Sequence, residues 1–138
     1  MNKRGPIVVI EDDADDREMI VEIFKDLGYP NKIMCFDNGA DTLIFLKQID
    51  VFPFLILSDI NMPVMDGLML RNEVLNDNDL RNKCIPYLFY STSSNEKVIA
   101  DAYALSIQGF FVKPETYRDL KTALKTIVEY WQQCVAPR

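Results

Sequence analysis

Short runs of almost exclusively apolar residues recur along this chain, and a segment with helical periodicity follows each run. Runs this short are typical of strands that are buried on both faces of a sheet. The expected strands are 7–10, 32–36, 54–58, 85–90 and 110–112, and the expected helices are 15–27, 40–48, 67–76, 94–105 and 120–131. Five successive strand–helix units predict an α/β fold, in which a five-stranded parallel sheet is doubly wound with helices on both faces.

Length and composition narrow the classes of function. The 138 residues, of which 49% are hydrophobic, correspond to a single domain, 1–138, with a complete core. The absence of histidine excludes histidine-based catalysis, histidine metal ligands and a phosphohistidine on this chain. The five glycines fit neither G-x-G-x-x-G nor a P-loop, so nucleotide cradles of these two kinds are excluded.

Net charge and cysteine spacing indicate the partners and the cellular compartment of the protein. The formal net charge of -6 argues against nucleic acid or an anionic membrane as the main partner. The odd, widely spaced cysteines Cys35, Cys84 and Cys134 fit neither a disulfide framework nor a zinc site. No apolar run has the length of a membrane span or of a signal-peptide core. We therefore expect a cytoplasmic protein that does not contact a membrane.

Charged and hydroxyl side chains come directly after four of the expected strands. The first strand ends in Glu11 and Asp12, the third in Asp59, the fourth in Ser91 and the fifth in Lys113. Ligands of a doubly wound sheet bind outside the carboxyl ends of its strands, so these side chains are expected to converge. Unit charges about 4 Å apart repel by about 4 kcal/mol at an effective dielectric of about 20, so the carboxylates need a counter-charge.

A divalent cation is the counter-charge that best fits this donor set. Oxygen ligands without histidine or thiolate suit Mg²⁺, with Mn²⁺ as the alternative, and Lys113 adds a further positive charge. One carboxylate is then free to attack phosphorus, and Ser91 can bind a phosphoryl oxygen. Plainer explanations exist for single residues, since Asp15 and Asp16 suit a helix N-terminus and Tyr90 suits a core. The joint occurrence at four strand ends outweighs these explanations.

Four stretches, taken in order, resemble the receiver domain of a two-component response regulator of the chemotaxis-regulator type. They are 7–13, 57–67, 85–91 and 110–114, with the sequences IVVIEDD, LSDINMPVMDG, IPYLFYS and FFVKP. The similarity extends from about residue 6 to residue 133, which marks the core of the domain. The stretch STSSNE at 91–96 is similar to a subgroup of stand-alone regulators, some of which pair with phytochrome-type kinases. The resemblance implies the flavodoxin-like strand order 2-1-3-4-5 with five helices.

The resemblance also implies a role for each residue at the strand ends. Asp59 is then the phosphoacceptor, and Lys113 contacts the phosphoryl group. The metal ligands are then Asp12, Glu11 acting directly or through water, Asp59, and the backbone carbonyl of Asn61.

A conformational switch follows from the same resemblance. Ser91 takes the position of the switch hydroxyl, and Phe110 takes that of the aromatic residue that turns inward when the hydroxyl moves toward the phosphoryl group. Serine and phenylalanine stand where threonine and tyrosine are commoner, Thr92 replaces a smaller residue, and 106–107 replace a frequent Gly-Ala pair. None of these departures removes a catalytic group. The switched face consists of the fourth helix, the fifth strand and the last helix.

The expected function is that of a phosphoacceptor in a phosphorelay, not of an enzyme, with at most slow self-dephosphorylation. A partner histidine kinase, or a histidine phosphotransfer protein, supplies the phosphoryl group in a Mg²⁺-dependent reaction. The chain has no output domain, so the signal is expected to pass to a separate effector protein or through a homodimer formed by the switched face.

Three alternatives stay open. A small aspartate-dependent phosphatase usually has a second acid two residues after its nucleophile, where this chain has Asn61. A flavin-binding flavodoxin-like protein needs a phosphate-binding loop after the first strand, where Glu11 and its acidic neighbours would repel phosphate. A pseudo-receiver, which is a pure interaction module, keeps the fold without the chemistry, and the complete residue set argues against it.

Overall fold

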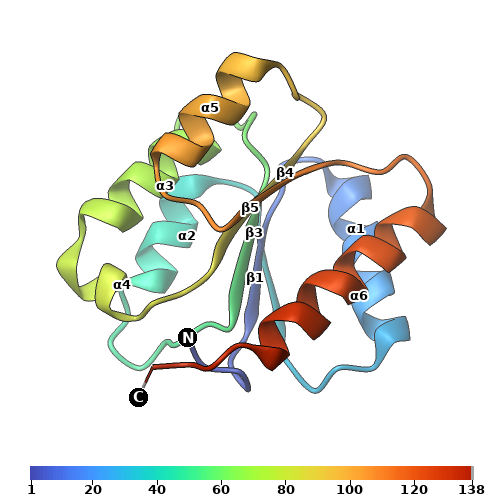
Figure 1. The fold of residues 1–138 in the computed structure, drawn as a ribbon, viewed down its shortest axis with the longest axis horizontal. Helices are drawn as coiled ribbons and strands as arrows, with labels where there is room; N and C mark the ends of the chain where they lie inside the picture. The colour runs from blue at the N-terminus through green and yellow to red at the C-terminus, as the bar shows by residue number, and fades with distance from the viewer. Residues whose placement is uncertain (138) are drawn as a thin grey trace.

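The computed structural model describes residues 1–137, in which a five-stranded parallel sheet stands between two layers of helices (Figure 1). The strands are β1 (Ile7–Ile10), β2 (Ile33–Phe36), β3 (Leu55–Ser58), β4 (Tyr87–Ser91) and β5 (Gly109–Val112). Their order is β2-β1-β3-β4-β5, and every neighbouring pair is parallel. The predicted order 2-1-3-4-5 is confirmed.

The helices number six within residues 1–137, whereas the sequence predicts five. They are α1 (Ala14–Leu27), α2 (Gly39–Leu46), α3 (Gly67–Asn76), α4 (Asn78–Asn82), α5 (Glu96–Ala104) and α6 (Tyr117–Gln133). The additional helix, α4, is a single short turn in a polar connection, and Leu80 is its buried residue. The Asp77 side chain caps it by accepting a hydrogen bond from the Leu80 N–H. One apolar residue has no periodicity, so hydrophobic spacing does not predict this helix.

The two faces of the sheet have separate hydrophobic cores because alternate strand residues point to opposite faces. Helices α1 and α6 cover the face that contains Ile7, Val9 and Leu57, and helices α2 to α5 cover the face that contains Val8 and Ile10. The two faces of β1 are both fully buried. This explains why the strand is apolar at every position. None of the helices of residues 1–137 combines the length and the apolarity needed to cross a bilayer.

Caps at helix N-termini fix where the chain leaves the carboxyl ends of the strands. Asp13 caps α1 by accepting a hydrogen bond from the Asp16 N–H, and Asp66 caps α3 in the same way from the Met69 N–H. Thr116 caps α6, so this helix begins at Tyr117, three residues before the start that its apolar period predicts. The chain termini lie at the opposite end of the sheet (Figure 1).

Gly67 allows the first turn of α3 to pack tightly against the end of β3. Its N–H donates to the Ile60 carbonyl at 2.8 Å. A Cβ at this position would lie 2.2 Å from the backbone oxygen of Asp59 and 2.8 Å from a ring carbon of Phe89. Both distances are far below van der Waals contact, so only glycine fits here without a backbone shift.

We predict that Gly67→Ala lowers the free energy of unfolding by about 3 kcal/mol, because the backbone oxygen of Asp59 cannot move aside as a flexible side chain would. Gly28→Ala is the control. A Cβ at Gly28 meets nothing within 4 Å, and only its φ of 72° is unfavourable, which costs about 1 kcal/mol. Urea unfolding of both variants measures the difference, and equal losses would contradict the proposed close approach.

Candidate functional site

A cluster of charged side chains lies at the carboxyl ends of the strands. These strand ends are at the upper edge of the sheet in Figure 1. The Lys113 ammonium, directly after β5, is at its centre. Its Nζ lies 2.6 Å from Glu11 Oε2, 3.3 Å from Asp59 Oδ2 and 3.3 Å from Asp16 Oδ2. The side chains of Lys113, Glu11 and Asp59 are 13%, 1% and 9% exposed, so the contacts among them are largely shielded from water, whereas Asp16 is 46% exposed. One cation therefore compensates three carboxylates.

The Glu11 carboxylate is the most deeply buried of the acids. Its Oε1 accepts the Asp13 N–H at 3.1 Å, and its Oε2 accepts both the Lys113 ammonium and the Tyr90 hydroxyl, the latter at 3.0 Å. Burial raises the pKa of Glu11, the hydrogen bonds from Lys113 and Asp13 act against that rise, and the charge of Asp59 adds to it. The carboxylate is tolerable inside the protein because donors meet both of its oxygens.

The pKa of Lys113 moves in the direction that keeps the ammonium charged. Burial acts to lower this pKa, but the hydrogen bond to Glu11 and the charges of Glu11, Asp59 and Asp16 outweigh burial and raise it. The pKa of Tyr90 is raised above its ordinary value by burial and by the neighbouring charge of Glu11. Its phenol therefore remains a hydrogen-bond donor at neutral pH.

Three carboxylates are close enough to share one cation. Glu11, Asp12 and Asp59 each offer an oxygen, and these oxygens lie within 4.8 Å of one another. Asp12 is exposed, whereas the other two are buried. The Arg17 guanidinium donates to the backbone carbonyls of Glu11 and Asp12, at 2.8 and 3.1 Å, which holds the turn after β1. Hard oxygen donors in this number suit a divalent cation of the Mg²⁺ or Mn²⁺ type.

Asp59 follows β3 directly and is 7% exposed. The next residue of its loop, Ile60, orients its carboxylate. Its Oδ1 accepts the Ile60 N–H at 2.7 Å, while its Oδ2 faces Lys113. Asn61, two residues further on, has an exposed side chain whose amide donates to the Ser93 hydroxyl at 2.7 Å. This contact connects the loop after β3 to the loop after β4.

The two residues predicted to form a switch lie on neighbouring strands, Ser91 on β4 and Phe110 on β5. Ser91 is fully buried, and its hydroxyl oxygen accepts the Ser93 N–H at 3.1 Å. Phe110 is half-buried against the α2–α5 side of the sheet, and its ring centroid lies 6.2 Å from that of Phe89. The Ser91 hydroxyl is thus engaged by its own loop and not by an acid of the cluster.

Sequence reasoning missed three participants in the cluster. Asp16 contacts Lys113, Arg17 holds the turn after β1, and the Tyr90 hydroxyl reaches Glu11. The plainer explanations of Asp16 as a helix N-terminus residue and of Tyr90 as a core residue are therefore incomplete. The sequence position of Tyr90 could have indicated its role, because Tyr90 immediately precedes Ser91 at the end of a strand.

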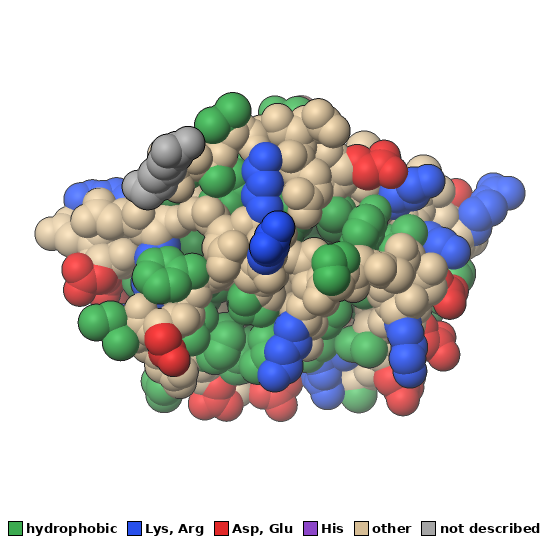
Figure 2. All heavy atoms as spheres, turned by 90° about the horizontal axis from the view of Figure 1, so that it is seen from below, with side chains coloured by type: hydrophobic (Ala, Val, Ile, Leu, Met, Phe, Trp, Pro, Cys, Tyr) green, Lys and Arg blue, Asp and Glu red, His purple; other side chains and the backbone are tan. Residues whose placement is uncertain are grey.

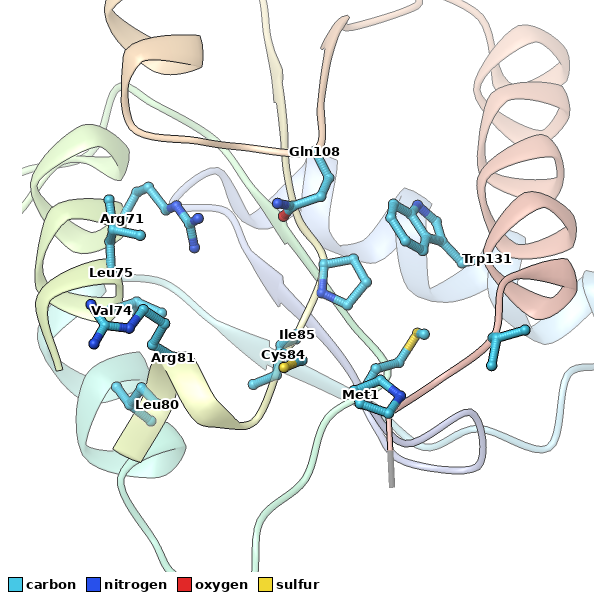
Figure 3. Close-up of a pocket in the computed structure, with 13 residues that line it drawn as sticks. Met1, Arg71, Val74, Leu75, Leu80, Arg81, Cys84, Ile85, Gln108 and Trp131 are labelled. Carbon is cyan, nitrogen blue, oxygen red and sulfur yellow. The ribbon is translucent and has the colours of Figure 1, made fainter. Parts of the chain in front are cut away.

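Three hollows of the surface, of about 560, 400 and 330 Å³, lie away from this cluster. A cavity of about 330 Å³ opens near the chain termini, between Arg71 of α3 and Trp131 of α6 (Figure 3). The Arg71 guanidinium is occupied there, because it donates to the carbonyls of Leu105 and Ser106, both at 2.9 Å. Figure 2 shows this end of the molecule, where basic and apolar side chains are intermixed. A smaller hollow of about 250 Å³ adjoins the acidic cluster and is lined by Tyr90, among others.

Comparison with known proteins finds one matching family model and several similar proteins. The family model of the response regulator receiver domain matches residues 7–125. Chemotaxis protein CheY-3 of Vibrio cholerae is 31% identical over 129 residues, which cover 94% of this chain and 95% of that protein. Response regulator Rcp1 of Synechocystis sp. is 27% identical over 134 residues, which cover 94% of this chain and 90% of that protein.

Solved structures show the same fold. The phosphorylated cyanobacterial phytochrome response regulator RcpA superposes with a TM-score of 0.85 and 28% identity, and covers 96% of both chains. The Mn²⁺-bound form of response regulator Rcp1 superposes with a TM-score of 0.83 and 26% identity, covering 98% of this chain and 99% of that one.

We predict that Lys113→Met lowers the free energy of unfolding at pH 7 by about 3 kcal/mol, because it leaves the buried Glu11 carboxylate without its cation. A carboxyl whose folded pKa is raised contributes stability at low pH and loses it as pH rises through that pKa. The deficit relative to wild type should therefore shrink as the pH is lowered to about 5.

Lys125→Met is the matched control. The Lys125–Glu129 pair is exposed at both ends and 3.9 Å apart, so its loss should change stability by less than about 0.5 kcal/mol at either pH. Urea unfolding at the two pH values measures both variants. A deficit in Lys113→Met that did not change with pH would show that the carboxylate is not its cause.

Proposed function

The chain belongs to the receiver domain family of response regulators, and we propose that it acts as a phosphoacceptor in a two-component relay, with Asp59 as the residue that takes the phosphoryl group. The observation that best supports this role is the contact of Asp59 Oδ2 with the Lys113 ammonium at 3.3 Å. A cation held beside a buried carboxylate is suited to receive the negative charge that a phosphoryl group brings.

Receiver domains generally interact with histidine kinases or with histidine phosphotransfer proteins, and this chain has no histidine of its own. The proposed donor is therefore a phosphohistidine on such a partner. Asp59 Oδ2, the oxygen that faces Lys113, forms a bond to phosphorus while the phosphorus–nitrogen bond breaks, and the leaving imidazole takes up a proton from solvent. The Ile60 N–H holds the other Asp59 oxygen, so that the attacking oxygen keeps one orientation. Similarity to the phytochrome response regulator RcpA favours a phytochrome-type kinase as that partner.

We propose that the acidic cluster holds Mg²⁺, with Mn²⁺ as an alternative. Asp12 and Asp59 would bind the ion directly, together with the backbone carbonyl of Asn61, and Glu11 would bind it directly or through water. The close approach of three carboxylate oxygens and the Mn²⁺-bound state of the similar Rcp1 structure support this assignment. When bound, the cation would neutralise charge on the transferred phosphoryl oxygens.

The proposed output is a change in one face of the molecule. Ser91 would exchange its Ser93 partner for a phosphoryl oxygen, and Phe110 would turn inward. The affected face consists of α5, β5 and α6. It is the face predicted from sequence as the fourth helix, the fifth strand and the last helix, because the unpredicted helix α4 shifts the helix numbers by one. This face exposes Tyr103, Val112 and Tyr130. A 100-fold change in affinity for an effector protein, or for a second copy of the chain, requires about 2.7 kcal/mol.

We propose that the protein turns over no separate substrate and acts in the cytoplasm. Asn61 stands where aspartate-dependent phosphatases usually have a second acid, and its amide is engaged by Ser93. Loss of the phosphoryl group would then be limited to slow self-dephosphorylation.

We predict that wild-type protein incubated with a small acyl phosphate and Mg²⁺ gains the mass of one phosphoryl group, and that Asp59→Asn does not. Asp66→Asn is the control, since Asp66 lies in the same loop, caps α3, and is replaced by an equally good cap. Intact-mass spectrometry measures all three proteins. Chelation of the divalent ion should abolish the gain. Phosphorylation of Asp59→Asn to the wild-type extent would refute the assignment.

We predict that Ser91→Ala is phosphorylated but does not switch, because the variant lacks the hydroxyl that binds the phosphoryl oxygen, whereas Ser91→Thr switches normally. Beryllofluoride with Mg²⁺ mimics the phosphorylated state, and fluorescence of Trp131, the single tryptophan, reports on α6. Ser94→Ala, an exposed serine in the same loop, should respond as wild type does. An unchanged response in Ser91→Ala would remove Ser91 from the switch.

A further inference from the structure

Tyr90 connects two strands that are not neighbours in the sheet. It lies on β4, and its hydroxyl donates to Glu11 Oε2, at the end of β1, over a distance of 3.0 Å. Strand β3 lies between β4 and β1 in the sheet, so this bond spans the strand that ends in Asp59. The Tyr90 residue is 4% exposed, and water is therefore largely excluded from the bond.

The same side chain also contacts Lys113. The Lys113 Nζ lies 5.0 Å from the centroid of the Tyr90 ring, within the range of a cation–π interaction. Tyr90 thus touches both members of the shortest ion pair in the cluster, Lys113 with Glu11. Its hydroxyl and the Lys113 ammonium bind the same carboxylate oxygen.

The hydrogen bonds on Glu11 show what this contact does. Three donors hold its carboxylate, namely the Asp13 N–H, the Lys113 ammonium and the Tyr90 hydroxyl. In the proposed reaction, Lys113 turns toward the phosphoryl group on Asp59. Glu11 then keeps one donor on each oxygen, and Tyr90 supplies the donor on Oε2. Without this hydroxyl, Oε2 would lose its last protein donor as soon as the ammonium turned away.

We propose that Tyr90 is a positioning residue of the phosphoryl-transfer site, whose hydroxyl fixes the orientation of the Glu11 carboxylate toward the divalent cation. This inference rests on the proposed function. Groups that hydrogen-bond to a metal-binding carboxylate orient it, and their removal typically weakens metal binding by about 10-fold to 100-fold. Tyr90 acts through Glu11 and is not itself a ligand of the ion.

Tyr87 provides a matched control on the same strand. Both tyrosines are buried. Tyr87 lies three residues before Tyr90 on β4, so its side chain points to the opposite face of the sheet. Its hydroxyl lies 3.5 Å from the Gly67 carbonyl, and the Arg71 guanidinium lies 5.2 Å from its ring centroid. Tyr87→Phe therefore removes a buried phenolic hydroxyl beside a cation, but not one that reaches a carboxylate of the cluster.

The test measures Mg²⁺ binding to the full chain by isothermal titration calorimetry, with wild type, Tyr90→Phe and Tyr87→Phe compared. Tyr90→Phe should bind Mg²⁺ about 10-fold more weakly, and Tyr87→Phe should bind it as wild type does. Half-maximal phosphorylation of Tyr90→Phe by a small acyl phosphate should accordingly require about 10-fold more Mg²⁺ than half-maximal phosphorylation of wild type. Circular dichroism confirms that each protein is folded at the temperature used.

A double-mutant cycle separates an effect through Glu11 from a general loosening of the fold. In a Glu11→Gln background, the Tyr90→Phe change should weaken Mg²⁺ binding no further. The inference is overturned if Tyr90→Phe binds Mg²⁺ as tightly as wild type, if Tyr87→Phe loses as much affinity, or if the two changes are additive. Absence of both Mg²⁺ binding and phosphorylation in wild type would instead overturn the proposed function, and this inference with it.

Discussion

The contact between the Lys113 ammonium and three carboxylates is the interaction on which the acidic edge of the sheet depends. A buried carboxylate without a partner costs several kcal/mol, and Glu11 is almost completely buried. Lys113 compensates Glu11, Asp59 and Asp16 at once, and its own raised pKa keeps it charged. The three carboxylates can therefore lie together at this edge of the sheet because one ammonium contacts all of them.

Strand geometry decides which side chains take part in this cluster. Tyr87 and Tyr90 are three positions apart on β4, so they point to opposite faces of the sheet. The first is paired with Arg71 of α3, and the second with Glu11 and Lys113. The same residue type thus stabilises the α3 side of the fold in one case and orients a functional carboxylate in the other.

The strands and the convergence of Glu11, Asp12 and Asp59 could be predicted from sequence, because buried parallel strands are apolar throughout and their ends share one edge. The strand order followed from the family resemblance and not from the apolar pattern. Helix α4 could not be predicted, since a single turn around Leu80 has no hydrophobic period. The contact of Asp16 with Lys113 could not be predicted either. An acid in a first helical turn is already explained by the helix dipole, and its second partner comes from a distant segment.

Glu11 and Lys113 are 102 positions apart, and the fifth strand must be in place before they can meet. During synthesis on the ribosome, the acids after the first strand emerge long before the lysine that neutralises them, so these acids have no Lys113 partner until β5 and the residue after it have emerged. Truncated chains that stop before β5 would lack the charge balance of the site altogether. The charge balance of this edge therefore forms only once β1 and β5 have joined the same sheet.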